Sequence, residues 1–192
     1  MKKTLLITLL LIPFLGISQT TKPIDGVLGI KFGDTREQAI ATIKARGGIP
    51  NAPGANPNFQ TFSNIKLGHR DAFGAYITML DDKVYWIGIM FNIELEAQVI
   101  DYYNNLVKDI SDVYGQPTRI VKAFKDPYKD GDGFETQAIS TGNANYITFW
   151  TSGDNSIEVF ITTKLKVVVN YYDNKTKAIA DKRQKDKEKA DF

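Results

Sequence analysis

The feature that most constrains the fold is a pattern that occurs twice along the chain. A helical segment ends at a Gly-x-Pro stop, first at Gly48-Ile49-Pro50 and again at Gly115-Gln116-Pro117. After each stop come a loop and short strands that are typical of antiparallel hairpins. We therefore expect an internal repeat, with one unit over about residues 26–92 and a second over about 93–173.

Both helices carry start signals or periodic apolar positions. Before the first, Asp34 or Thr35 can cap the free amides, and Glu37 or Gln38 can complete a capping box. In the second, apolar residues recur every three or four positions. These residues are Leu95, Val99, Tyr103, Leu106, Ile110 and Val113. The spacing predicts an amphipathic helix that begins near residue 92 and ends at Gly115.

The remaining apolar runs alternate as strands do and are separated by turn residues, among them Asp81-Asp82-Lys83 and Ser152-Gly153-Asp154-Asn155. The expected strands are Val27 to Phe32, Phe59 to Leu67, Phe73 to Leu80, Val84 to Phe91, Thr118 to Phe124, Tyr146 to Thr151, Ile157 to Thr162 and Leu165 to Tyr172. We predict an α+β fold. Two tandem α-β-β(-β) units would form an antiparallel sheet with helices packed on one face.

Residues 1–18 have the pattern of a secretory signal peptide: Lys2 and Lys3, an apolar run from Leu5 to Leu15, then Gly16-Ile17-Ser18. The run is too short for a transmembrane helix, which takes about 20 apolar residues. We expect a periplasmic or secreted protein whose residues 19–173 form a single domain of two repeats. The sequence has no cysteine, so packing must hold this domain without disulfides, and no lipid anchor at cysteine is expected.

Charge indicates little affinity for polyanions. The formal net charge is +2, and Lys2 and Lys3 would leave with the signal peptide. Residues 174–192 form a charged tail in which basic side chains alternate with acidic ones, and we expect it to be helical or disordered. A near-neutral chain with a diluted basic tail predicts no nucleic-acid partner.

The run Phe32-Gly33-Asp34-Thr35-Arg36-Glu37-Gln38-Ala39, closing with Gly48-Ile49-Pro50, resembles a helix-entry motif of small extracytoplasmic α/β repeat domains. Such domains include the small lipoprotein of outer-membrane assembly and the β-lactamase inhibitor proteins. Their pattern is Gly-x-Thr-x-x-Gln-Val followed by Gly-x-Pro, and here Ala39 replaces the valine. The lipoprotein's N-terminal cysteine is absent, and the two-unit plan looks more like the inhibitor proteins. That resemblance implies a sheet that binds another protein.

Strand alternation places unusual residues on one face of the expected sheet. We assign the helix-packed face to Ala75, Ile77, Met79, Tyr85, Ile87, Ile89, Phe91, Ile147, Phe149, Val159, Ile161, Val167 and Val169. The opposite face then holds the proposed binding residues Tyr76, Trp86, Met90, Tyr146, Trp150, Phe160 and Tyr172, together with Thr78, Thr148 and Val168. A solvated face would be polar, so we interpret this one as a recognition surface. The alternative is a face covered by a loop, the C-terminal helix or a second copy in a homodimer.

Other chemical motifs are weak. The loop at 126–135 is acidic like a calcium loop, but Tyr128 and Gln137 fall at ligand positions, which favours a surface turn. His69 is the only histidine and precedes a strand, which fits a turn residue better than a triad or metal ligand. The paired acids Asp81 and Asp82 fit a turn. We expect no catalytic residue, metal or cofactor.

The sequence therefore predicts a non-catalytic extracytoplasmic module, protein-binding or envelope-associated, that uses the aromatic face. Two alternatives stay open: a glycan-binding protein, because exposed aromatic rings suit sugar rings, and a carboxylate-dependent hydrolase with acids near Asp81, Asp82 or the 126–135 loop.

Overall fold

One antiparallel sheet organises the computed structural model, which describes residues 22–190. Its eight strands lie in the order β3 (Ile49–Pro50), β4 (Phe59–Ser63), β7 (Gly74–Leu80), β8 (Lys83–Phe91), β12 (Val167–Asp173), β11 (Asn155–Ile161), β10 (Ala144–Ser152) and β9 (Arg119–Phe124). The first half of the chain starts at one edge of the sheet, with β3, and reaches the centre at β8. The second half starts at the other edge, with β9, and reaches the centre at β12.

Two similar units meet in the middle of this sheet. Helix α1 (Arg36–Ala45) precedes β3, β4, β7 and β8, and helix α2 (Val99–Tyr114) precedes β9, β10, β11 and β12. The last strands of the two units pair with each other, with Ile89 opposite Val169. The prediction of an α+β fold with tandem units and one continuous antiparallel sheet is confirmed.

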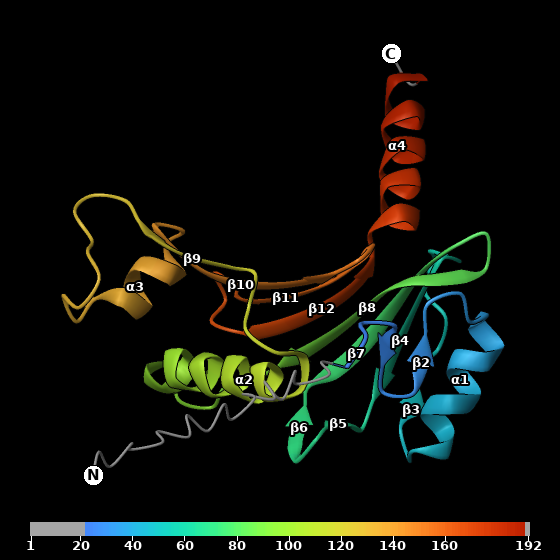
Figure 1. Cartoon of the computed structure of the whole chain (residues 1–192), viewed down its shortest axis with the longest axis horizontal. Coiled ribbons are helices and arrows are strands. Elements are labelled where there is room, and N and C mark those ends of the chain that lie inside the picture. The colour runs from blue at the N-terminus through green and yellow to red at the C-terminus, as the bar shows by residue number, and fades with distance from the viewer. Residues whose placement is uncertain (1–21, 191–192) are drawn as a thin grey trace, which may run out of the picture.

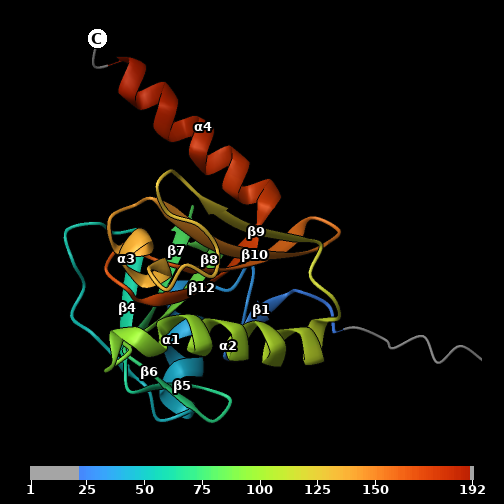
Figure 2. The ribbon, with the colours of Figure 1, turned by 90° about the vertical axis from the view of Figure 1, so that its left-hand side faces the viewer.

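The helices divide between the two sides of the sheet. Figure 1 shows α1 and α2 below the sheet, while α4 (Asn174–Ala190) rises from the upper side. The short helix α3 (Glu135–Ser140) packs on β10 through Ala138 and Ile139, which belong to the same core cluster as the α2 residues. Figure 2 shows α4 projecting away from the sheet. The sheet face opposite α1, α2 and α3, which α4 contacts only at one end, is called the helix-free face below.

Helix α1 begins and ends as its sequence predicts. Thr35 is the N-cap, its side chain accepts from Gln38 N–H, and the Gln38 side chain accepts from Thr35 N–H. After the helix, Gly47 has a φ of +81°. A Cβ on Gly48 would lie 2.5 Å from Ile43 Cγ2, so only glycine lets the chain turn this closely against the helix.

Helix α2 starts later than the apolar spacing predicts. Its buried face consists of Val99, Tyr103, Leu106 and Ile110, and Gly115 ends it with a φ of +83°. Leu95 lies before the helix and is 60% exposed. A short 3₁₀ turn, η1 (Glu96–Gln98), occupies the segment where the first helical turn was expected.

Several local elements differ from the prediction. The strand expected over 59–67 is broken at Asn64, whose φ is +55°, and β5 (Ile65–Leu67) pairs instead with β6 (Arg70–Ala72). Strands β1 (Gly26–Val27) and β2 (Ile30–Lys31) form a second small hairpin. Residues 135–140, where no helix was predicted, form α3.

The structure describes the charged tail but not the expected signal peptide. Of the two states expected for the tail, the structure shows the helix, α4, which contains no buried residue. The expected signal peptide, residues 1–18, lies outside the described residues. Among residues 22–190, no helix is both long enough and apolar enough to cross a membrane.

Candidate functional site

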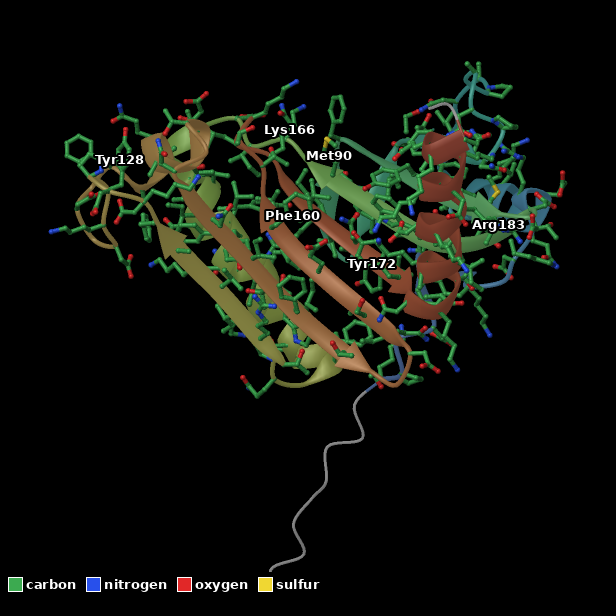
Figure 3. The ribbon with its side chains drawn as sticks, turned by 90° about the horizontal axis from the view of Figure 1, so that it is seen from above. Met90, Tyr128, Phe160, Lys166, Tyr172 and Arg183 are labelled. Atoms are coloured by element: carbon green, nitrogen blue, oxygen red, sulfur yellow. The ribbon has the colours of Figure 1, made fainter. Side chains whose placement is uncertain are left out.

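The helix-free face carries an apolar row that crosses five strands. Residues directly opposite each other in antiparallel strands share a face, and the register aligns one residue from each of β9, β10, β11, β12 and β8. This apolar row consists of Val121, Ile147, Phe160, Val168 and Met90. All except the buried Val168 are half-buried. Figure 3 shows Phe160 and Met90 on the same side of the sheet as α4.

Beside the apolar row lies an aromatic cluster, defined as Phe59, Tyr76, Trp86 and Tyr172. Its rings contact in sequence across β4, β7, β8 and β12, with centroid separations of 5.4, 5.6 and 5.2 Å. The Tyr76–Trp86 pair is edge-to-face, an arrangement that the charge distribution of aromatic rings favours. The cluster therefore forms a rigid aromatic surface next to the first turn of α4.

A buried amide joins the cluster to its neighbours. Asn170 is 2% exposed, and its Oδ1 accepts from the Tyr76 hydroxyl at 2.8 Å and from Trp86 Nε1 at 3.0 Å. The Tyr172 hydroxyl donates to Glu158 Oε2 at 3.0 Å. Because these bonds hold the three rings in place, the surface that they present is already fixed before any ligand arrives.

Burial within the cluster changes tyrosine acidity. Desolvation, followed by the Glu158 charge, raises the pKa of Tyr76 to about 12. The same two causes, in the same order, raise the pKa of Tyr172, and its hydrogen bond to Glu158 raises it further. Both hydroxyls therefore stay protonated at neutral pH and act as donors.

Two of the seven predicted binding residues lie on the other face, so their placement in the prediction was wrong. Tyr146 and Trp150 are 4% and 2% exposed and point toward the helices. Trp150 Nε1 donates to the Gly115 carbonyl at the end of α2, 2.9 Å away. Tyr146 packs edge-to-face on Tyr103. Helix α2 supplies an acceptor for the Trp150 indole and a ring for Tyr146 to pack on, so β10 buries both side chains and turns Ile147 and Phe149 to the helix-free face.

The other five predicted residues, Tyr76, Trp86, Met90, Phe160 and Tyr172, do share the helix-free face. Sequence reasoning missed Phe59, Asn170 and Glu158 there. For Asn170 and Glu158, the signal was a polar residue within an apolar strand, at a position whose neighbours on the same face are aromatic.

Cationic side chains border the helix-free face. Lys166 Nζ lies 4.4 Å from the ring centroid of Phe73, which is 65% exposed. At the α4 end, Lys177 Nζ lies 5.8 Å from the Tyr172 ring, and Arg183 makes two hydrogen bonds to Asp81 at 2.8 and 2.9 Å. Figure 3 shows Lys166 near Met90 and Arg183 on α4.

The acidic side chains considered for chemistry have structural partners. In the 126–135 loop, Asp132 accepts from Lys129 N–H and Phe134 N–H, Glu135 accepts from Gly131 N–H, and Asp130 pairs with Lys122. Residues 22–190 contain no group of three or more histidine or acidic side chains placed to hold a metal ion. Asp81 and Asp82 form the two-residue turn between β7 and β8, both with positive φ. His69 lies in the turn between β5 and β6.

No family model and no curated protein matches this sequence. A distant resemblance connects it with the crystal structure of a DUF4309 family protein, YjgB, from Bacillus subtilis. The TM-score is 0.38 at 15% sequence identity, over 72% of this chain and 77% of that chain. A likeness at this level carries no argument about function.

Proposed function

We propose that this protein is a non-catalytic, extracytoplasmic binding module that recognises another protein through its helix-free sheet face. The observation that carries the proposal is the apolar row beside the aromatic cluster, because a sheet face left to water alternates to polar residues. The extracytoplasmic location rests on the signal-peptide pattern of residues 1–18.

The composition of the face supports a protein partner. Interface centres are enriched in aromatic residues and methionine, and their rims are polar. Here the apolar row and Trp86 form the centre, and Lys166 and Lys177 lie at the borders. Rings held by Asn170 lose little freedom on docking. Trp86, Phe160 and Met90 are the residues that we expect to contribute most to affinity.

A glycan is the second candidate ligand, because polar groups adjoin the aromatic cluster. Glu158 Oε2 lies 3.0 Å from the Tyr172 hydroxyl, and Tyr172 stacks against Trp86 at a centroid separation of 5.2 Å. A ring face next to a carboxylate can hold a sugar by stacking and by hydrogen bonds to its hydroxyls. Such binding would centre on Trp86 and Glu158, whereas a protein partner would also cover Phe160 and Met90.

Photocrosslinking tests the protein-binding proposal. Phe160 is replaced by the photocrosslinking residue p-benzoylphenylalanine in cells. In the matched control, p-benzoylphenylalanine replaces Phe134, which is 58% exposed on the loop before α3. We expect a defined crosslinked polypeptide from position 160 that is absent from position 134. The added mass and its peptides identify what covers the face.

Three results would contradict the proposal. Equal crosslinking from both positions would indicate nonspecific contact. A product that contains only two copies of this chain would assign the face to self-association. Absence of any product, together with retention of the protein on a glycan array that Trp86→Ala abolishes and Phe160→Ser does not, would favour the glycan.

A further inference from the structure

A cavity of about 650 Å³ lies on the opposite side of the sheet from the helix-free face. Its walls are the β1–β2 hairpin, the turn between β5 and β6, and the second half of α2. The volume lies within the range of small-molecule sites, roughly 300 to 1,000 Å³.

Part of the cavity lining is apolar. Leu28, Ile30, Leu106 and Ile110 line it and are otherwise buried in the core. Val113 also lines it and remains 48% exposed. A valine on the buried side of an amphipathic helix is normally covered by protein, so its exposure marks apolar surface that a ligand can cover.

The charged groups around the cavity leave a positive surplus. The lining contains the bases Lys22, Lys31, Arg46 and Arg70 and the acids Asp25, Asp109 and Asp112. Arg70 pairs with Asp109 at 2.6 Å, and Asp112 pairs with Lys108 from outside the lining at 2.9 Å. The charged lining residues outside these two ion pairs are the bases Lys22, Lys31 and Arg46 and the acid Asp25. Within residues 22–190, none of these three bases makes a salt bridge.

A pair of tyrosines, Tyr171 and Tyr114, adds two hydroxyl groups to the cavity lining. Tyr171 is 2% exposed and lies edge-to-face with Tyr114, at a centroid separation of 6.2 Å. Lys22 Nζ lies 5.9 Å from the centroid of the Tyr114 ring. Lys22 and these hydroxyl groups belong to the polar part of the lining, and the apolar part lies along α2.

We propose that this cavity binds a small amphipathic anion, with a carboxylate, sulfonate or phosphate group on an apolar body. The apolar lining accepts the body, and Lys31 and Arg46 attract the charge. This site is separate from the helix-free face, so either proposal can fail without the other.

Binding of 8-anilinonaphthalene-1-sulfonate to the purified protein tests the cavity. We expect saturable fluorescence enhancement that decanoate competes away and that decyltrimethylammonium competes far less. Val113→Trp places a large side chain at the cavity wall and should abolish binding. Ile179→Trp is the matched control, because Ile179 is 50% exposed on α4, and it should bind as the unchanged protein does.

A second variant tests the charge without filling the cavity. Lys31→Gln combined with Arg46→Gln should weaken the affinity about three- to tenfold, as expected for two exposed charges. Circular dichroism verifies that each variant is folded. The cavity proposal would be overturned by unchanged affinity in Val113→Trp or by equal competition from the cationic amphiphile. It would also be overturned if only Phe160→Ser lost binding. The last result would leave the helix-free face as a binding surface.

Discussion

Tyr76 lies across Gly88, its direct partner in the β7–β8 pair, and leaves no room for a side chain there. A Cβ on Gly88 would lie 2.1 Å from Tyr76 Cζ and 2.5 Å from its hydroxyl oxygen. The ring can therefore cross β8 and reach Asn170 on β12, which is the next residue in the same cross-strand row.

Gly88→Ala should displace this ring and break its hydrogen bond to Asn170. We expect the free energy of unfolding to fall by about 2–3 kcal/mol, from overpacking and the lost bond, as measured by urea unfolding. Gly54→Ala is the control, because its Cβ would meet nothing within 4 Å. The same glycine substitution in a Tyr76→Ala background should cost much less, and equal costs in both backgrounds would show that the two residues are not coupled.

Asn170→Leu should destabilise the aromatic cluster as a unit. It removes the acceptor of both the Tyr76 hydroxyl and Trp86 Nε1, and we expect a loss of about 2–3 kcal/mol. Trp86 emission should also change, since its indole loses a partner. Asn145→Leu, at an exposed position of β10, is the matched control, expected to change stability by less than about 0.5 kcal/mol. Similar losses in both variants would show that the Asn170 bonds contribute nothing.

Thr148→Val tests the orientation of β10. Thr148 is completely buried and lies 2.5 Å from the Tyr103 hydroxyl of α2. Valine has the same shape but leaves that hydroxyl unpaired, so a loss of about 1–2 kcal/mol is expected. Thr78→Val on the helix-free face should change stability by less than about 0.5 kcal/mol. A loss of less than about 0.5 kcal/mol for Thr148→Val as well would show that β10 is placed in the wrong phase.

The order of the elements could be predicted because glycine, proline and capping residues mark their ends, as Thr35 and Gly115 do. The phase of β10, that is, which of its residues point toward the helices, could not be predicted. This strand carries aromatic or large apolar residues on both faces. Hydropathy favours burying Ile147 and Phe149. Burying Tyr146 and Trp150 requires partners at Tyr103 and the Gly115 carbonyl, and alternation contains no information about such distant contacts.

The cavity and the hydrogen bonds of Asn170 could not be predicted from the sequence either. Asn170 bonds to Tyr76 and Trp86, which precede it by 94 and 84 positions in the sequence. The cavity is lined by three segments that only the tertiary fold brings together. The β5–β6 hairpin was missed because Asn64 adopts a left-handed conformation inside what reads as one strand.

Alkaline pH should destabilise the protein through Tyr76. Below pH 10 this hydroxyl is protonated in both the folded and the unfolded chain. Between pH 10 and about 12, the pKa in the folded state, only the unfolded chain ionises, so up to about 2–3 kcal/mol of stability is lost as pH rises. Urea unfolding at pH 9 and pH 11 measures the loss. Tyr76→Phe should reduce the pH dependence, and an identical dependence in both proteins would contradict the assignment.

The proposed function requires that the helix-free face is open in the free protein. Light scattering on a sizing column measures the oligomeric state, and acrylamide quenching of the single-tryptophan variants Trp150→Phe and Trp86→Phe measures the exposure of each indole. We predict a monomer in which Trp86 is quenched readily and Trp150, 2% exposed, is protected. A dimer in which Trp86 is as protected as Trp150 would contradict the claim and assign the face to a second copy of the chain.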